Sequence, residues 1–158
     1  MAPQVGDKLP EVILYEGVPD AKVKLTDLFA GKKGILFGLP GAYTPGCSKT
    51  HLPGYVADFD KFKAAGADVI VCVATNDPFV MSAWGEAHAV GNKVRMLSDM
   101  DAKLTDAFGI ALNILGSKRM SRFSAVISDN EIKAWNGEEG GAMSCSLSNP
   151  TLAQLKAL

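Results

Sequence analysis

Short apolar runs alternate along this chain with stretches of helical character. Three runs have the length and apolar content of buried strands: 34–39 (GILFGL), 68–74 (DVIVCVA) and 94–99 (VRMLSD). Each is followed by a stretch that we expect to be helical: Ser48 to about Ala65, 76–90 and 101–110. This alternation predicts an α/β protein with a largely parallel central sheet covered by helices on both faces.

Two of the helical stretches carry start or break signals. Asp77 is suited to cap the helix of 76–90, and Pro78 takes its first position, where the missing N–H has no helical partner to lose. Pro53-Gly54 lies inside the stretch that begins at Ser48. It predicts a kink or a frayed first turn there.

The last third of the chain changes pattern. RFSAVIS (122–128) and EIKAWN (131–136) are separated by Asp129-Asn130, which predicts an antiparallel hairpin at the sheet edge. Asn149-Pro150 is expected to cap a final helix over 151–156. Between them, 136–150 is rich in Gly and Ser and is predicted to be an exposed, mobile loop.

Composition bounds the class of protein. With 158 residues, 47% hydrophobic and 21% charged, and without an internal repeat or linker, we expect one globular domain over 1–158. The net charge of -1 excludes nucleic acid or an anionic membrane as the main partner, and the basic run at 117–122 is too short to change this.

The chain also shows no sign of export or membrane insertion. No apolar run approaches the ~20 residues that span a bilayer, and the first ten residues lack the layout of a signal peptide. The odd number of cysteines is untypical of a secreted disulfide framework. We expect an intracellular, cytoplasmic protein, and removal of a targeting segment would leave a mitochondrial or peroxisomal location open.

Cys47 ends the segment PGAYTPGC (40–47), between a predicted strand and a predicted helix. Sites in open α/β sheets gather at the carboxyl ends of strands. A helix N-terminus offers free N–H groups and partial positive charge, which favour a thiolate, the reactive form of cysteine. The Pro and Gly residues fix a tight loop whose amides can point at a small group, and Thr44 adds a hydroxyl. We therefore interpret Cys47 as an activated thiol rather than an apolar filler.

The other two cysteines lie in different settings. Cys72 is in the middle of the run VIVCVA and is predicted to be inert core packing. Cys145 lies in the predicted loop, where it is either a stray exposed cysteine or a second thiol that reaches an oxidised Cys47. A sulfenic acid condenses with a nearby thiol to give a disulfide. Spacing alone leaves both interpretations of Cys145 open.

Two competing kinds of site would involve His51, four residues after Cys47 on the same predicted helix face. A zinc site needs three or four ligands, and no CxxC or HxxxH pair accompanies these residues. A Cys–His hydrolase usually takes its histidine from a separate element. We interpret His51 as a polar helix residue that packs beside the loop, and His88 as a surface residue.

A reactive thiolate also needs a fixed cation, which stabilises it and the charge that develops on a leaving group. The candidates are Arg95, Arg119 and Arg122. We rank Arg122 first because it begins the predicted strand of 122–128, and an arginine on a strand is held better than one on a loop.

A family resemblance rests on these same residues. PGAYTPGCSKTHLPGY (40–55) resembles the active-site segment of peroxiredoxins, in which a proline, a threonine and a cysteine are spaced as Pro40, Thr44 and Cys47 are here. The continuation CSKTHLPG is similar to the type II or peroxiredoxin 5 subgroup. The similarity runs nearly end to end, through VGDKLP, KKGILFGLPGA, NDPFVMSAWG, RFSAVI and SCSL in that order.

The resemblance implies a thioredoxin-like fold, with a central mixed sheet flanked by helices on both faces, and a thiol peroxidase reaction. Cys47 would be the peroxidatic cysteine. Thr44 would hydrogen-bond the peroxide, and Arg122 would stabilise the thiolate and the transition state. Pro40 would shield the pocket, and the amides of Gly46 and Cys47 would complete the substrate site.

Cys145 falls where atypical two-cysteine members of the family carry an intrachain resolving cysteine. A related branch places its second cysteine differently and uses glutaredoxin, and Cys72 matches that strand position. The three-cysteine set favours the intrachain route with thioredoxin as reductant. A peroxidase recycled by glutaredoxin or glutathione, and a peroxide-sensing redox module without turnover, remain open.

The resemblance further implies hydrogen peroxide and alkyl hydroperoxides as substrates, no cofactor or metal, and a monomer or weak homodimer. A disulfide needs Cα atoms within about 7 Å. We therefore expect the reduced form to hold Cys47 and Cys145 apart. Disulfide formation would then require the loop to move and the start of the Cys47 helix to unwind.

Overall fold

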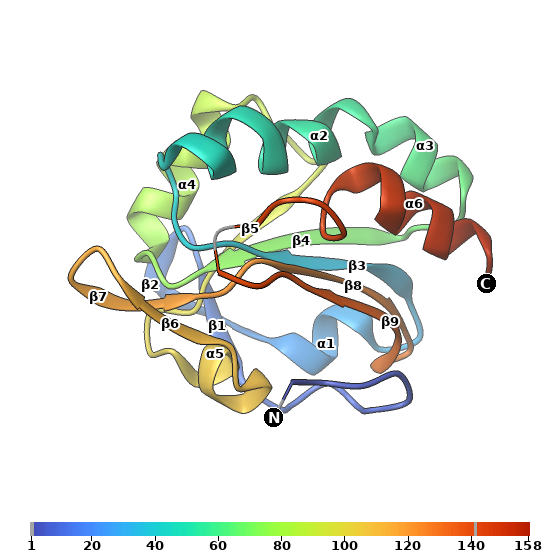
Figure 1. Cartoon of the computed structure of the whole chain (residues 1–158), viewed down its shortest axis with the longest axis horizontal. Coiled ribbons are helices and arrows are strands. Elements are labelled where there is room, and N and C mark those ends of the chain that lie inside the picture. The colour runs from blue at the N-terminus through green and yellow to red at the C-terminus, as the bar shows by residue number, and fades with distance from the viewer. Residues whose placement is uncertain (1, 141) are drawn as a thin grey trace.

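A seven-stranded sheet lies between two layers of helices in the computed structural model, which describes residues 2–140 and 142–158 (Figure 1). The sheet has the strand order β2-β1-β5-β4-β3-β8-β9. Its strands are β1 (Ile13–Glu16), β2 (Val18–Lys24), β3 (Lys33–Gly38), β4 (Val69–Ala74), β5 (Arg95–Ser98), β8 (Phe123–Ser128) and β9 (Glu131–Gly137). A separate hairpin consists of β6 (Ala111–Ile114) and β7 (Ser117–Met120).

The centre of the sheet is parallel and both sides are antiparallel. β3, β4 and β5 run parallel, as the alternating pattern predicts, whereas β8 and β9 on one side and β1 and β2 on the other run antiparallel. The carboxyl ends of the three parallel strands therefore meet at one edge, beside the loop that carries Cys47. The predicted mixed α/β sheet is confirmed, and the antiparallel strands on the β1 side are an addition to the prediction.

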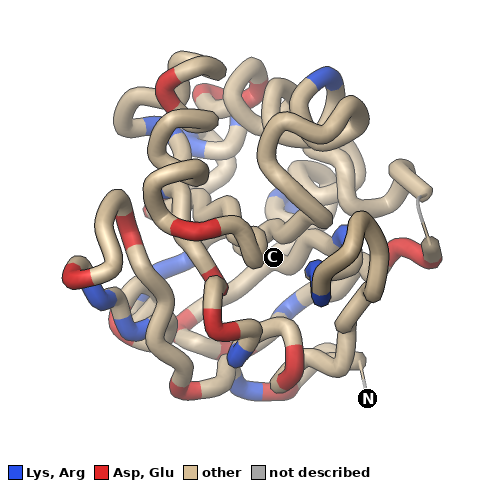
Figure 2. The backbone as a smooth tube through the Cα atoms, turned by 90° about the vertical axis from the view of Figure 1, so that its left-hand side faces the viewer, with Lys and Arg blue, Asp and Glu red and all other residues tan. Residues whose placement is uncertain are grey.

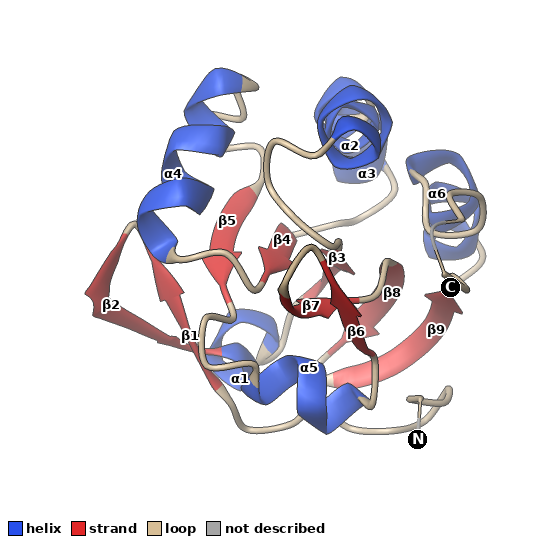
Figure 3. Ribbon diagram, turned by 60° about the vertical axis from the view of Figure 1, so that its left-hand side comes forward, coloured by secondary structure: helices blue, strands red, loops and turns tan. Residues whose placement is uncertain are grey.

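Helices cover both faces of the sheet (Figure 3). They are α1 (Leu25–Phe29), α2 (Leu52–Ala57), α3 (Phe59–Ala64), α4 (Pro78–Ala87), α5 (Lys103–Phe108), α6 (Ser148–Lys156) and a π-helix, η1 (Cys47–His51). α2, α3, α4 and α6 pack on one face, and α1 and α5 pack on the other. Successive strand side chains point to opposite faces, so Ile35 and Phe37 join the first core, and Leu36 joins the second.

The predicted helix of 76–90 is confirmed in its start. The Asp77 side chain accepts a hydrogen bond from the Val80 N–H at 2.9 Å, and Pro78 is the first helical residue. The predicted helix from Ser48 to Ala65 is also interrupted at Asp58, which separates α2 from α3 and was not predicted. The final helix starts at Ser148, three residues earlier than predicted.

The predicted hairpin turn is also confirmed. Asp129 and Asn130 have φ values of 47° and 63°, the left-handed conformation that a two-residue turn between β8 and β9 requires. Five elements were not predicted at all: β1, β2, α1, β6 and β7. β2 and β6 are mostly exposed, so they lack the apolar alternation that marks a half-buried strand.

Charged residues of both signs are interspersed over the molecule. In the view of Figure 2, Lys and Arg are mixed with Asp and Glu along the backbone. In the part of the chain that the structure describes, no helix is long and apolar enough to cross a membrane.

Candidate active site

The loop that carries Cys47 leaves the carboxyl end of β3 and is tied to its neighbours in the sheet. The Ala42 N–H donates to Oδ1 of Asn76, which follows β4, at 2.8 Å. Oγ of Ser98, at the end of β5, donates to the Asn76 carbonyl at 2.5 Å. These two hydrogen bonds join the ends of the three parallel strands. The loop that carries Cys47 thus lies at the predicted edge of the sheet, and Asn76 is a supporting residue that sequence reasoning missed.

The loop is held in a tight turn just before the helix. Oγ1 of Thr44 donates to the Gly41 carbonyl at 2.7 Å. Tyr43, one residue earlier, has a φ of 63°, a left-handed conformation that is strained for a residue with a side chain. Because the Thr44 hydroxyl donates its proton to Gly41, its oxygen lone pairs remain able to accept a hydrogen bond.

Cys47 lies in the first turn of the helical segment and is fully buried. That turn is wider than an α-helical turn: the Leu52 N–H bonds to the Cys47 carbonyl, five residues back. Pro53 has no N–H and so cannot make the α-helical bond to the Lys49 carbonyl. Single π-turns of this kind are common at functional sites. The predicted distortion near Pro53 is therefore present, as a widened turn that contains Cys47.

Arg122 lies against the residue that precedes Cys47. A Cβ built on Gly46 would stand 3.3 Å from Nη2 of Arg122, so the guanidinium packs on the Gly46 backbone. Arg122 is only 6% exposed, and its Nε has no hydrogen-bond partner among the described residues. Arg122 was predicted to begin the strand. It directly precedes β8 instead, because the β3–β8 and β8–β9 pairing begins at Phe123.

The two other candidate arginines have different surroundings. Arg95 makes a two-pronged ion pair with Glu16, with Nε at 3.0 Å and Nη2 at 2.6 Å from its carboxylate oxygens. Arg119, on β7, donates from Nη1 to the Pro40 carbonyl at 3.1 Å. Arg95 is therefore committed to an ion pair outside the site, whereas Arg119 holds the cysteine loop from the hairpin side.

His51 is fully buried and joins two elements. Its interpretation as a polar helix residue that packs beside the loop did not anticipate this bridging position. Nη1 of Arg122 lies 2.9 Å from its Nδ1, and the Ser146 carbonyl lies 3.1 Å from its Nε2. Burial and the neighbouring Arg122 charge lower the pKa of His51 to about 3, despite an opposing effect of the hydrogen bond to Ser146. His51 is therefore neutral at physiological pH.

Glu138 makes hydrogen bonds to the segment after β9, which the prediction of an exposed, mobile loop did not anticipate. The Glu138 carboxylate accepts hydrogen bonds from the backbone N–H groups of Ser144 and Ser146, at 2.5 and 3.0 Å, and from both hydroxyls, at 3.1 and 2.7 Å. Burial alone would raise the pKa of Glu138, but these bonds outweigh it and lower the pKa to about 2. Sequence reasoning missed Glu138 and Ser146 as well as Asn76, since their contacts depend on the folded loop.

The remaining two cysteines are free thiols, as is Cys47. Cys145 is partly exposed, and its Sγ lies 3.7 Å from the Gly137 carbonyl. Partial burial, and then a hydrogen bond to the Glu138 carboxylate, raise the pKa of Cys145. Cys72 is buried within β4, in the same core cluster as Cys47, and burial raises its pKa well above the ordinary value. Both settings favour the protonated thiol.

A hollow of about 430 Å³ opens beside the cysteine loop. Thr44 and Arg122 contribute polar groups to its lining, and Pro40 and Gly46 line it from the cysteine loop. The β6–β7 hairpin adds apolar side chains to the lining, from Leu112, Ile114 and Leu115. The residues that the resemblance places around a peroxide are thus gathered at one hollow, at whose edge Gly46 adjoins the buried Cys47.

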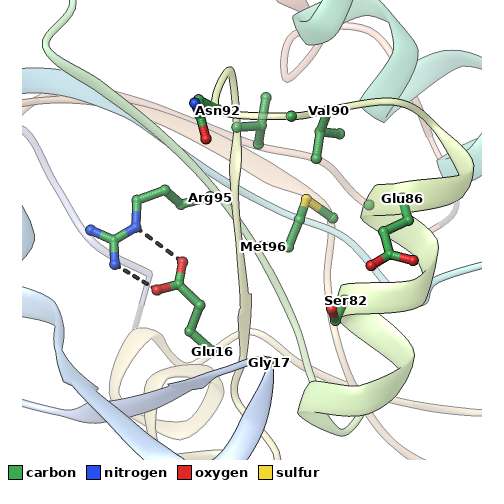
Figure 4. Close-up of a pocket in the computed structure, with 11 residues that line it drawn as sticks. Glu16, Gly17, Ser82, Glu86, Val90, Asn92, Arg95 and Met96 are labelled. Carbon is green, nitrogen blue, oxygen red and sulfur yellow. Dashed lines mark hydrogen bonds and ion pairs between the residues drawn. The ribbon is translucent and has the colours of Figure 1, made fainter.

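A larger hollow, of about 520 Å³, lies elsewhere and contains no cysteine (Figure 4). It is lined by the Glu16–Arg95 ion pair and by residues of α4 and the segment that follows it, including Ser82 and Glu86. Size alone therefore does not mark the site of the thiol chemistry. Over residues 2–140 and 142–158, no group of three or more His, Cys, Asp or Glu side chains is placed to hold a metal ion.

Sequence comparison gives the same family that the site geometry suggests. A family model described as Redoxin matches residues 4–142. Peroxiredoxin-2E-2, chloroplastic, from Oryza sativa subsp. japonica is 39% identical over 161 residues, which cover 96% of this chain and 72% of that protein. Peroxiredoxin-2B from Arabidopsis thaliana is 36% identical over 163 residues, which cover 98% of this chain and all of that protein.

Solved structures with a similar fold carry related names. Peroxiredoxin 5 from Alvinella pompejana superposes with a TM-score of 0.90 and 38% identity, over 99% of each chain. Reduced Prx3 from Vibrio vulnificus, solved in complex with H₂O₂, superposes with a TM-score of 0.91 and 38% identity, over 97% of this chain and 99% of that one.

A thioredoxin-like fold with a cysteine at a helix start, and relatives of this similarity, define a thiol-based redox enzyme. The chain belongs to the Redoxin family, and within it to the type II peroxiredoxins. It is therefore a thiol peroxidase, which reduces peroxides at the expense of a thiol reductant.

Proposed function

We propose that this chain reduces hydrogen peroxide and organic hydroperoxides at Cys47, forms an intrachain disulfide with Cys145, and is recycled by thioredoxin. The observation that carries the proposal is the position of the Arg122 guanidinium against Gly46, directly before the buried Cys47. A positive charge held at a cysteine in the first turn of a helix is the setting in which a thiolate is most stable.

In the first step, the Cys47 thiolate attacks the nearer oxygen of the peroxide. An S–O bond forms, the O–O bond breaks, and the leaving oxygen takes a proton to become water or an alcohol. Nε of Arg122, unpaired among the described residues, would donate to the negative charge as it develops. The Thr44 oxygen would accept the hydrogen bond of the peroxide O–H, because its own proton is directed to Gly41.

The apolar side of the 430 Å³ hollow supports organic hydroperoxides as substrates. Leu112, Ile114 and Leu115 line it together with Pro40. An alkyl group of a hydroperoxide could be buried there while its O–O group stays at the polar end, and each buried CH₂ contributes about 0.8 kcal/mol. Small apolar hydroperoxides would therefore bind at least as well as hydrogen peroxide.

In the second step, the Cys145 thiolate attacks the sulfur of the Cys47 sulfenic acid. An S–S bond forms, the S–O bond breaks, and the hydroxyl leaves as water after it takes a proton. The adjacent Ser146 bonds to His51, on the helical turn that carries Cys47, so the two thiols belong to neighbouring segments. An external dithiol then reduces the disulfide and restores both thiols.

A peroxidase assay on three single variants tests this scheme. Cys47→Ser is expected to abolish peroxide turnover with every reductant. Cys145→Ser should still consume one peroxide per chain but lose turnover with thioredoxin. Cys72→Ser is the matched control: it removes a buried thiol from the same core cluster and should change turnover less than twofold.

The same assay, run with thioredoxin and glutaredoxin side by side, distinguishes the alternatives. Thioredoxin turnover that survives in Cys145→Ser would show that Cys145 is not the resolving cysteine. Turnover with glutaredoxin alone would overturn thioredoxin as the reductant. Oxidation of Cys47 without turnover under either reductant would identify a redox sensor instead of a peroxidase.

A further inference from the structure

Four residues around the cysteine helix form a closed ring of hydrogen bonds. The Arg122 guanidinium bonds to His51, His51 bonds to the Ser146 carbonyl, and Ser146 donates from its N–H and hydroxyl to the Glu138 carboxylate. The ring closes through the backbone, because the Glu138 N–H donates to the Arg122 carbonyl at 2.9 Å. It thus joins the cation beside Cys47 to Ser146, the residue that follows Cys145.

The chemistry of the ring fixes the proton on His51. A guanidinium can only donate, so Nδ1 of His51 must accept from Arg122. A carbonyl can only accept, so Nε2 must carry the proton and donate to Ser146. The Ser146 carbonyl, which also accepts from the Tyr55 hydroxyl at 2.6 Å, therefore selects the one neutral form of His51 that can hold Arg122.

Glu138 holds the Ser146 end of this ring in place. Its carboxylate accepts four hydrogen bonds from Ser144 and Ser146, the residues on either side of Cys145. Hydrogen bonds to an ionised group are stronger than those between neutral groups. Burial first, and then Glu138, raise the pKa of the Cys145 thiol and so disfavour its reactive thiolate form.

We propose that Glu138 is a latch that docks the Cys145 segment, and that His51 relays the docked state to Arg122. This inference rests on the proposed roles of Cys47, Cys145 and Arg122. While the segment is docked, Arg122 is held for peroxide reduction at Cys47, and Cys145 is held between Ser144 and Ser146, which are bound to Glu138. When the segment leaves Glu138 to form the disulfide, Ser146 leaves His51, and Arg122 loses its fixed acceptor.

The latch predicts opposite effects on the two chemical steps. Glu138→Gln replaces the carboxylate by an amide that has one acceptor oxygen and no charge, so at least one of the four bonds is lost and the others weaken. Oxidation of Cys47 should become about tenfold slower, because His51 and Arg122 are less firmly held. Disulfide formation from the sulfenic acid should become several-fold faster, because the segment is released more easily and the pKa of Cys145 falls. Loss of structure alone would not speed one step while slowing the other.

The experiment is rapid mixing of the reduced full-length chain with hydrogen peroxide. The first step is measured in the Cys145→Ser background, so that resolution does not interfere, and the second step is measured with Cys145 present. Glu139→Gln is the matched control, since it removes an exposed neighbouring carboxylate outside the ring, and it should leave both rates unchanged. If Glu138→Gln does not fold, Ser146→Ala removes one of the four bonds and should shift both rates in the same directions.

A second variant tests the relay itself. The amide side chain in His51→Asn offers an oxygen close to the place of Nδ1 but cannot reach the Ser146 carbonyl. In His51→Asn, Glu138→Gln should therefore have no further effect on the first step, whereas independent contributions would add. Suppose that Glu138→Gln leaves both steps unchanged or slows them equally, while the parent chain consumes peroxide normally. That result would overturn the latch and leave the proposed function standing. Absence of peroxide consumption by the parent chain would instead overturn the proposed function.

Discussion

Nη1 of Arg122 donates to Nδ1 of His51 over 2.9 Å, so the buried guanidinium has a neutral partner. A carboxylate at this position would neutralise the charge of Arg122. Neutral His51 fixes the orientation of the guanidinium and leaves its positive charge unbalanced. An unbalanced buried charge costs folding free energy, and a thiolate at Cys47 would recover part of that cost.

Arg122→Lys should therefore lower the rate of Cys47 oxidation by about 100-fold, a size typical for the loss of one oriented donor at a developing charge. Lysine keeps the positive charge. It lacks the planar guanidinium, which can donate to His51 and still keep Nε as a further donor. The rate is measured by competition for hydrogen peroxide against a peroxide-sensitive probe. A rate within threefold of the parent would show that charge alone is sufficient.

Acid should destabilise the fold through His51. Its pKa is about 3 in the folded chain and 6.5 ordinarily, so between these values the unfolded chain binds a proton that the folded chain does not. Stability should thus fall as the pH drops below about 6.5, by up to about 1.4 kcal/mol per pH unit. Urea denaturation between pH 5 and 7 measures this slope. This pH range lies above 4.5, the ordinary pKa of Glu138. The stability that ionised Glu138 contributes is therefore lost only at lower pH.

His51→Asn is the control for this slope, because the asparagine does not titrate. The pH dependence of its unfolding free energy should be flatter between pH 5 and 6.5 than that of the parent chain. Parallel slopes in the two proteins would mean that His51 is not the group responsible.

Local patterns predicted the core of this fold well and the long-range contacts of its site poorly. The three parallel strands, the Asp77 cap and the Asp129-Asn130 turn depend on residues close in sequence, so each was predictable. The role of His51 depends on Ser146, 95 residues away, and the latch depends on which Glu a serine-rich loop folds onto. Nothing in local periodicity carries that information.

Trp84 should report the unwinding of the cysteine helix. Its indole N–H donates to Oγ of Ser48, the residue after Cys47, at 2.9 Å. If the disulfide unwinds this turn, that bond breaks and the fluorescence of Trp84 changes on oxidation by peroxide. Trp84→Phe should abolish the change, and Trp135→Phe, which removes the other tryptophan, should keep it. If the fluorescence of Trp84→Phe still changes on oxidation as in the parent chain, the movement lies elsewhere.

Arg95→Gln should separate the second hollow from the peroxidase reaction. The substitution breaks the ion pair between Arg95 and Glu16. Because the side chains of Arg95 and Glu16 are 41% and 35% exposed, we expect a stability loss of about 0.5 kcal/mol. Peroxide turnover should stay within twofold of the parent, because Arg95 is committed to Glu16 and lies outside the cysteine site. A tenfold loss of turnover at normal stability would restore Arg95 as a candidate cation.

Gly41→Ala should disturb the site through Arg119. A Cβ at this position would stand 2.4 Å from Nη1 of Arg119, the atom that donates to the Pro40 carbonyl. Arginine is flexible enough to move away, so the fold should survive with a loss of about 1 kcal/mol, the net value of one hydrogen bond. The loop that carries Thr44 would then be held less firmly, and we expect peroxide reduction to slow about tenfold.

The pair Gly41 and Arg119 can be tested by a double-mutant cycle. Arg119→Ala removes the same hydrogen bond to Pro40 and also makes room for the new methyl group. If displacement of Arg119 is the cause, Gly41→Ala combined with Arg119→Ala should be no slower than Arg119→Ala alone. Additive losses would instead point to the other neighbours of the new Cβ, Thr44 Cγ2 at 3.3 Å and Asn76 Oδ1 at 3.5 Å. In that case the methyl group would act on the loop directly, through the hydrogen bond between Asn76 and Ala42.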